Sequence, residues 1–244
     1  MIKYIIGGLR AIFPIIFGCI KCSYMSHHKD KYPLEVRYAK ARRLAIYVNR
    51  CFRAHLIIEN KQIVDDNHQH GRIYICNHQT VFDILAMFEL SERPITFISK
   101  KENKKVPFLN VVSNCIDTLY IDRNDVRQSI KICKQAAELA LNENRDIVLF
   151  PEGTRSKDGR VHEFRSALIS LVSNSKVEVV MVCLYNSKGP LKFRFIKYPK
   201  EYVKVKVFEP LSYEYFLENK KTFAEYTRNA IQEQYDLYDK ERNK

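Results

Sequence analysis

Short apolar runs typical of β-strands recur along the chain from residue 54 onward. The run VEVVMVCLY is apolar almost throughout, as expected for a strand that is buried on both faces. The strands predicted from these runs are 55–59, 72–76, 95–99, 118–122, 146–150, 177–185, 192–197 and 202–208.

Stretches with apolar residues at helical spacing separate most of these strands. Asp125, with Gln128 three residues later, has the pattern of a capping box at the start of one such stretch. The predicted helices are 81–90, 124–140, 163–171 and 213–240. Strands that alternate with helices predict an α/β domain. Because the last strands follow one another directly, we expect a mixed, mostly parallel sheet that is covered by helices.

The N-terminal segment is apolar from residue 4 to residue 20 except for Arg10, and glycines and Pro14 interrupt it. A helix of this length spans about 26 Å, slightly less than a hydrocarbon core of about 30 Å. The pattern fits either an apolar helix that packs on the domain or a helix that enters the membrane interface. We predict that residues 1–24 are helical and associate with a membrane.

A second predicted helix covers residues 33–53, where basic residues lie among apolar positions at helical spacing. This basic amphipathic pattern fits either a helix that covers the core or one that lies on anionic lipid. We therefore divide the chain into N-terminal membrane-associated helices (1–53), an α/β domain (54–210) and C-terminal helices that pack on it (211–244).

The net charge of the chain indicates which classes of binding partner it favours. The 41 Lys and Arg residues against 28 Asp and Glu give a formal net charge of +13. Such a surplus favours nucleic acid, an acidic membrane face or a phosphorylated substrate, without choosing among them. The seven cysteines have no repeating spacing and fit the reduced thiols of a cytosolic protein.

A histidine and an aspartate follow the predicted strand 72–76. Five residues apart on one helix, His78 and Asp83 would point about 140° away from each other. They meet if His78 lies in the turn before the helix and Asp83 in the first turns of the helix. Asp83 would then hold one ring nitrogen and leave the other free to accept a proton. The same spacing also fits a structural cap.

Two further loops follow predicted strands and carry polar groups. Arg123, in YIDRND, has a guanidinium suited to phosphate, but it fits an ion pair with a neighbouring aspartate equally well. In FPEGTRSKDGR (150–160), a carboxylate, a hydroxyl and Arg155 share a turn in which Gly153 permits close backbone approach. This loop fits either a site for a phosphorylated group or an ordinary surface turn.

Together these loops resemble the glycerolipid acyltransferases of the 1-acylglycerol-3-phosphate acyltransferase family. NHQTVFD resembles the N-H-x-x-x-x-D motif of that family, YIDR its second block and FPEGTRS its third, and ISKKENKKVPFLNVV lies between the first two. Order and spacing agree over roughly residues 70–185. The chain departs from the family at Asn110 and Asp117, where glycine is usual, and at Met181, where proline is usual.

The resemblance implies transfer of an acyl group from acyl-CoA or acyl carrier protein to the free hydroxyl of 1-acylglycerol-3-phosphate, which gives phosphatidic acid. His78 would be the general base and Asp83 the residue that holds its tautomer. Backbone amides at residues 77–80 are candidate donors to the oxyanion. No metal or bound cofactor is implied. The residues expected to hold the acceptor are Lys100, Arg123, Glu152, Gly153, Thr154 and Arg155.

The expected partners are a lipid acceptor, an acyl thioester and an anionic membrane surface at the cytoplasmic face, with acyl carrier protein as one possible donor. Nucleic acid is not expected, because the basic residues are spread along the chain and tryptophan is absent. The alternatives are an acyltransferase for another lysolipid, a thioester hydrolase that uses the same pair on water, and a basic membrane- or nucleic-acid-binding module.

Overall fold

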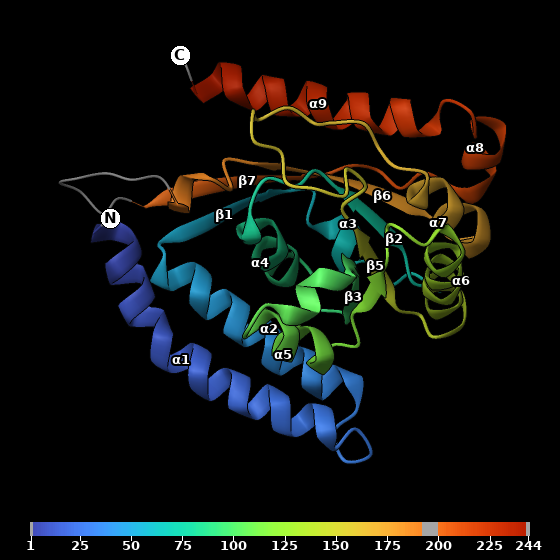
Figure 1. Cartoon of the computed structure of the whole chain (residues 1–244). Helices are drawn as coiled ribbons and strands as arrows, with labels where there is room; N and C mark the ends of the chain where they lie inside the picture. The colour runs from blue at the N-terminus through green and yellow to red at the C-terminus, as the bar shows by residue number, and fades with distance from the viewer. Residues whose placement is uncertain (1, 192–199, 243–244) are drawn as a thin grey trace.

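The computed structural model describes residues 2–191 and 200–242, in which a sheet lies between two layers of helices (Figure 1). The sheet of the described residues has the order β1-β7-β6-β2-β5-β3-β4. Its strands are β1 (Ala54–Glu59), β2 (Ile73–Cys76), β3 (Ile95–Lys100), β4 (Leu119–Ile121), β5 (Asp146–Leu149), β6 (Val179–Tyr185) and β7 (Glu201–Val207).

Neighbouring strands are parallel except β6 and β7, which run antiparallel. The predicted mixed, mostly parallel sheet is therefore confirmed. Every residue of β6 is buried, as its continuous apolar sequence predicted. The predicted strand 192–197 lies outside the described residues.

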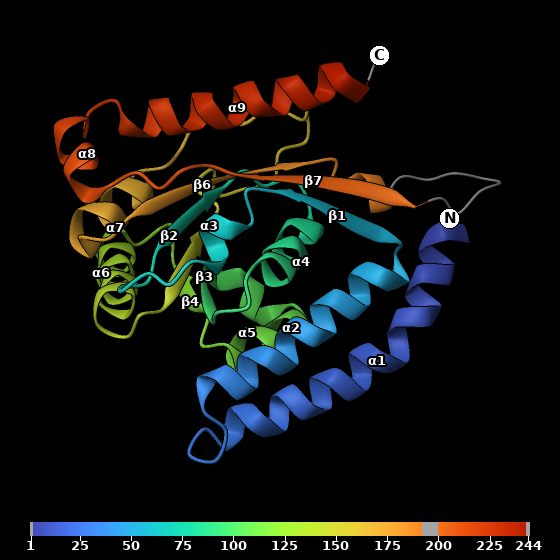
Figure 2. The same ribbon diagram turned by 180° about the vertical axis from the view of Figure 1, so that it is seen from behind.

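Helices cover both faces of the sheet (Figures 1 and 2). Alternation along β2 sends Ile73 and Ile75 into one core and Tyr74 and Cys76 into the other. The first core is covered by α6 (Val126–Asn142), α7 (Ala167–Ser175), α8 (Tyr213–Glu218) and α9 (Phe223–Arg242). The second is covered by α2 (Leu34–Cys51), α3 (Gln62–Asp65), α4 (Val81–Leu90) and α5 (Leu109–Cys115). Two 3-10 turns, η1 (Lys101–Lys105) and η2 (Gly189–Leu191), complete the described elements.

Two predicted helices differ clearly from the observed ones. Helix α7 begins at Ala167, not at residue 163, and long-range hydrogen bonds hold the loop before it: Val161 N donates to Gln232, His162 N to Glu152, and Arg165 N to Pro151 O. The predicted helix 213–240 is two helices, α8 and α9, which residues 219–222 separate.

The predicted capping box at α6 is half correct. The Asp125 side chain accepts from Gln128 N at 3.0 Å, as in a capping box. The Gln128 side chain, however, accepts from Asp122 N at 2.8 Å and not from the cap residue. It therefore ties the end of β4 to α6 and fixes the loop that carries Arg123.

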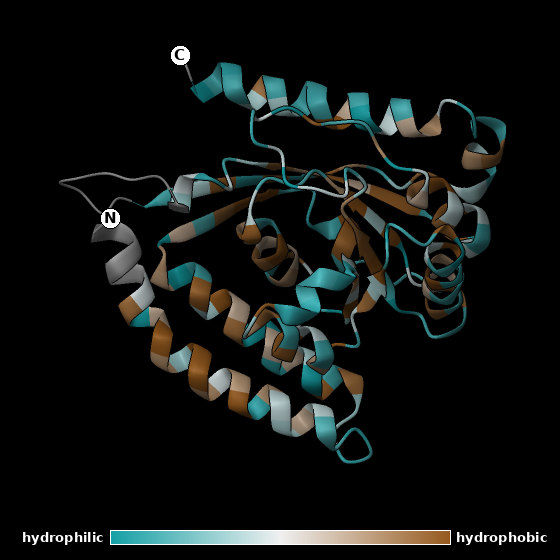
Figure 3. Cartoon of the chain, viewed as in Figure 1, coloured by the Kyte–Doolittle hydropathy of each residue, from teal (hydrophilic) through white to brown (hydrophobic). Residues whose placement is uncertain are grey.

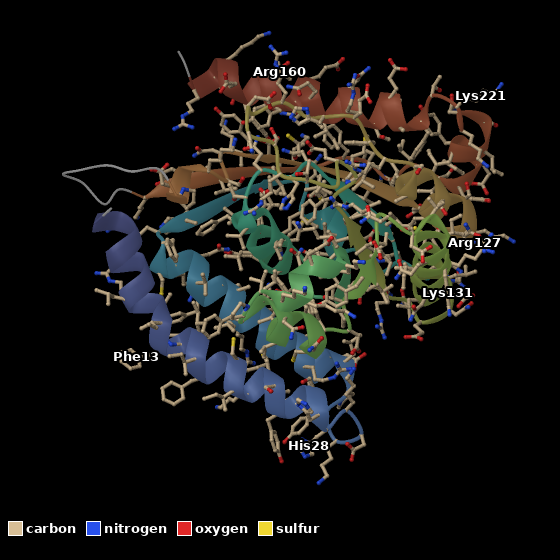
Figure 4. All side chains as sticks on the ribbon, in the orientation of Figure 1. Phe13, His28, Arg127, Lys131, Arg160 and Lys221 are labelled. Atoms are coloured by element: carbon tan, nitrogen blue, oxygen red, sulfur yellow. The ribbon has the colours of Figure 1, made fainter. Side chains whose placement is uncertain are left out.

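The N-terminal helix α1 (Ile2–His27) is the outermost element and packs on α2 and α5 (Figure 1). Its inner side buries Ala11, Cys19, Cys22 and Met25. Its outer side leaves a stripe of large apolar side chains exposed, which comprises Leu9, Ile12, Phe13, Ile16, Phe17, Ile20 and Tyr24. Figure 3 shows hydrophobic residues in brown along the middle of α1. The Phe13 side chain is 68% exposed and points away from the body (Figure 4).

The segment Gly8–His27 is long and apolar enough to cross a membrane, a property shared by signal sequences and by core helices of soluble proteins. The predicted N-terminal apolar helix is therefore present. Because α2 packs on β1 and α4, the N-terminal helices join the body directly. The division of the chain at residues 53 and 210 stays a prediction.

Candidate active site

The turn after β2 places a histidine over an aspartate. The Asn77 side chain donates to Leu184 O at 2.9 Å and accepts from Leu184 N at 2.8 Å, which ties the turn to β6. Thr80 then caps α4, because its hydroxyl accepts from Phe82 N at 3.1 Å. Because a fixed turn is followed directly by a capped helix, His78 lies just before α4 and Asp83 lies in the first turn of α4.

His78 Nδ1 and Asp83 Oδ2 lie 2.9 Å apart, so the contact expected from the sequence is present. Asp83 is fully buried, and the same oxygen accepts from Gln79 N at 2.6 Å and Thr80 N at 2.7 Å. A carboxylate so held accepts from Nδ1–H and leaves Nε2 with its lone pair. The His78 ring also stacks on Phe150, with 4.3 Å between the ring centroids, which fixes its plane.

The backbone amides next to His78 already have partners. His78 N donates to Glu152 Oε1 at 2.8 Å, and the amides of Gln79 and Thr80 donate to Asp83. Of the amides at residues 77–80 that the sequence suggested as oxyanion donors, those of residues 78–80 are thus already occupied. In the part of the chain that the structure describes, the amides of Thr154 and Arg155 donate no hydrogen bond.

Glu152 joins the two loops instead of facing a cavity. Its side chain is 2% exposed, and its oxygens accept from His78 N at 2.8 Å and from His162 N at 3.0 Å. Burial raises the pKa of Glu152, and the two amides oppose this rise. Glu152 lines neither of the two cavities described below, and backbone amides already occupy its carboxylate oxygens.

Gly153 brings two arginines together. It has a φ of +71°, and a Cβ on it would stand 2.8 Å from Arg165 Nε and 3.4 Å from Arg123 Cζ. The Arg165 Nε–H donates to Glu152 O at 3.2 Å. The pKa of Arg123 lies below that of a free guanidinium, because partial burial and the charge of Arg165 both disfavour its protonated form.

A cavity of about 320 Å³ opens beside the His78 ring. Five of the six residues expected to hold the acceptor line it: Lys100, Arg123, Gly153, Thr154 and Arg155. Its other wall is formed by apolar side chains of α4, β3 and α5, including Val81, Ile84, Phe88, Phe97, Leu109 and Val112. The cavity thus joins a base and a cationic rim to an apolar interior.

Arg165 was not expected from the sequence. It lies in the stretch VHEFRS, outside the three motifs, and only the fold brings it to Arg123. The neighbouring lysines also differ in role: Lys101 pairs with Asp122, whereas Lys100 faces the cavity. Among the described residues no ion pair joins Arg123 to a neighbouring aspartate, and Asp122 pairs with Lys101.

Comparison with known proteins extends this picture. A family model described as Acyltransferase matches residues 55–185. This chain belongs to the acyltransferase family. The match begins in β1, ends in β6 and includes the His78 and Gly153 loops.

Relatives of this acyltransferase have names that also specify the acyl acceptor. It is 36% identical over 112 residues to a 1-acyl-sn-glycerol-3-phosphate acyltransferase of Chlamydomonas reinhardtii, over 46% of this chain and 33% of that protein. It is 28% identical over 139 residues to a protein of that name from Cocos nucifera, over 57% of this chain and 45% of that one. The matches thus cover less than half of either relative.

The fold also matches a solved structure over nearly its whole length. The crystal structure of the 1-acyl-sn-glycerophosphate acyltransferase PlsC from Thermotoga maritima superposes with a TM-score of 0.76 at 19% sequence identity. The alignment covers 98% of this acyltransferase and 95% of that chain. The likeness establishes that the two proteins share an architecture, including the helices outside residues 55–185.

Proposed function

We propose that this acyltransferase moves a fatty acyl group from an acyl thioester to the free hydroxyl of 1-acylglycerol-3-phosphate, which gives phosphatidic acid. The observation that carries the proposal is the oriented His78–Asp83 pair at the mouth of a cavity with a cationic rim and an apolar interior. The names of the relatives, 1-acyl-sn-glycerol-3-phosphate acyltransferase, support this choice of acceptor.

The chemistry begins with the acceptor hydroxyl, which is a weak nucleophile until a base removes its proton. His78 Nε2 takes this proton as the hydroxyl oxygen attacks the thioester carbonyl, and the buried Asp83 carboxylate stabilises the imidazolium that forms. The tetrahedral intermediate then collapses with cleavage of the carbon–sulfur bond. His78 returns the proton to the leaving thiolate, so the enzyme ends in its starting state.

Binding and orientation fall to the rest of the site. Lys100, Arg123 and Arg155 supply positive charge for the acceptor phosphate, while the apolar wall receives an acyl chain. The amides of Thr154 and Arg155 are candidate donors to the oxyanion. Glu152 acts as a positioning residue, because it fixes the His78 backbone. The donor thioester belongs to acyl-CoA or to acyl carrier protein.

The function is tested by product analysis. Purified protein is incubated with acyl-CoA or acyl carrier protein and a panel of lysolipids, and the products are resolved by mass. We expect phosphatidic acid to dominate when 1-acylglycerol-3-phosphate is supplied. Free fatty acid that forms at the same rate without any acceptor would instead identify a thioester hydrolase.

We also propose that the exposed stripe of α1 binds the acidic cytoplasmic face of a membrane. Seven large apolar side chains on one helical face are each between 39% and 68% exposed. The net charge of +13 adds attraction to an anionic leaflet. A lipid acceptor would then reach the site from the membrane surface.

Placing charge on this stripe should release the protein from membranes. Phe13→Asp with Phe17→Asp removes two exposed rings, and we expect partitioning onto liposomes of phosphatidylglycerol and phosphatidylcholine to fall about 100-fold or more. The measurement is co-sedimentation. The matched control is Leu237→Asp, whose side chain is 53% exposed on α9, the helix on the opposite side of the sheet from α1 (Figure 1). Equal sedimentation of wild type and the double variant would contradict the proposal.

A further inference from the structure

We propose that Arg165 forms with Arg123 a clamp for the phosphate of the lysolipid acceptor, and that the cavity beneath this clamp holds the acyl chain of the acceptor. The proposal rests on the proposed function and deepens it. It assigns the acceptor phosphate to Arg165, a residue outside the motifs. It assigns the acceptor acyl chain to a second cavity, which lies on the opposite face of the sheet from the cavity at His78.

The first observation is the close approach of two like charges. Arg123 and Arg165 both come within 3.4 Å of the point that a Cβ on Gly153 would occupy. Two guanidinium groups at such a distance repel each other unless an anion neutralises them. A phosphate offers oxygens to both forks of N–H donors and is the anion that such pairs bind well.

The second observation is that no carboxylate pairs with either arginine among the described residues. The buried arginines Arg37 and Arg72 pair with carboxylates, whereas Arg123 and Arg165 are exposed at the rim of the site and keep their donors open to solvent. The only hydrogen bond of the Arg165 side chain within the described residues goes to a backbone carbonyl. The pair therefore retains its charge and most of its donors for a ligand.

The third observation is a cavity of about 440 Å³ that lies between α6, α7 and the ends of β3 and β5. This volume lies in the range of small-molecule sites. Both arginines line it, and its walls are mainly aliphatic. The apolar lining residues are Ile98, Ile121, Val126, Ile130, Cys133, Leu149, Phe150, Pro151 and Ala167.

The two cavities meet at the catalytic loops. Arg123, Phe150 and Gly153 line both of them, whereas His78 lines only the first. A molecule with its hydroxyl at His78 and its phosphate on the arginines can thus extend its own chain away from the donor chain. The product of the proposed reaction carries two acyl chains, which matches two apolar cavities on opposite faces of one sheet.

The mouth of the second cavity combines exposed apolar side chains with basic ones, as a lipid-binding site does. Val126 and Ile130, on the first turns of α6, are 69% and 41% exposed and continue the apolar wall outward. Arg127 and Lys131 project from the same helix into solvent (Figure 4). An acyl chain would cover the exposed apolar surface, while its phosphate stays on the clamp.

The test of the clamp is Arg165→Gln. We expect the KM for 1-acylglycerol-3-phosphate to rise about 10- to 100-fold, as for the loss of a charge-assisted hydrogen bond, and the KM for the donor to stay within about twofold. Arg165→Lys should recover part of the loss. The matched control, Arg160→Gln, removes an exposed arginine from the same loop that lines neither cavity. A rise in the donor KM alone, or a fall in kcat with both KM values unchanged, would overturn the clamp.

Filling the cavity tests where the acceptor chain lies. Ser170→Phe, or the smaller change Ala167→Leu if the first variant does not fold, should raise the KM for long-chain acceptors about 10-fold and spare a short-chain one. Val112→Phe, in the first cavity, should instead change the preference for donor chain length. A Ser170→Phe enzyme with altered donor preference and normal acceptor KM would overturn the assignment of the chains.

Direct binding separates this proposal from the proposed reaction. Calorimetry with inorganic phosphate and with dodecyl phosphate needs no turnover. We expect wild-type protein to bind dodecyl phosphate more tightly, Arg165→Gln to weaken both ligands about 10-fold, and Ser170→Phe to remove only the advantage of the alkyl chain. Binding unaffected by Arg165→Gln would reject the clamp even if phosphatidic acid forms. Binding that follows this pattern without acyl transfer would retain the clamp and reject the reaction.

Discussion

Replacing His78 with alanine should lower kcat for acyl transfer by about 10²- to 10⁴-fold while the fold survives. The imidazole takes the proton from the acceptor hydroxyl, and no other described side chain next to it combines a basic nitrogen with a buried carboxylate. The measurement is steady-state turnover of purified protein with a thioester donor and a lysolipid acceptor.

The control for this variant is His70→Ala. His70 is exposed at the other end of the sheet, where its ring nitrogen contacts Leu141 O at 2.9 Å. It should leave kcat unchanged. The His78 variant should also retain its circular dichroism spectrum, because the ring contributes stacking on Phe150 but no cap to α4. A folded His78→Ala enzyme with near-normal turnover would remove the residue from the mechanism.

Asp83→Asn should have the second largest effect, a loss of about 10²- to 10⁴-fold in kcat with both KM values nearly unchanged. The amide keeps the size of the side chain but removes the charge that stabilises the imidazolium. It also weakens an acceptor that three N–H groups share, so the free energy of unfolding should fall by about 1–3 kcal/mol.

The two measurements separate catalysis from stability for Asp83. Thermal unfolding reports the lost hydrogen-bond strength, and turnover measured well below the unfolding temperature reports the lost charge. If Asp83 served only as a cap for α4, the variant would show the stability loss with a kcat close to wild type. That result would leave His78 without its orienting partner.

The sheet and the His78–Asp83 contact could be predicted because both depend on local sequence. Apolar runs place the strands, and a histidine one turn before a capped helix meets an aspartate in its first turn. The turn that Gly153 permits was also visible, as its φ of +71° bears out. These features need no knowledge of distant residues.

The roles of Glu152 and Arg165 could not be predicted, because they depend on contacts between residues that are distant in the sequence. Glu152 has the residue type of a substrate ligand, but its partners are amides at 78 and 162 that only the folded loops supply. Arg165 carries no motif, and its nearness to Arg123 follows from the start of α7. The misplaced helix boundary at residue 163 lies in the same loop, where Arg165 N donates to Pro151 O at 2.9 Å and α7 begins only at Ala167.

The tie between Glu152 and the His78 loop has a consequence for how the protein matures. The two residues are 74 positions apart, and a second bond, from Ser156 N to His78 O at 2.7 Å, closes the same long segment. During synthesis the turn after β2 leaves the ribosome well before the carboxylate that will fix it. We expect so distant a contact to close together with the pairing of β2 and β5, which joins the same two segments. Activity regained on refolding should therefore follow, and not precede, the recovery of helix content.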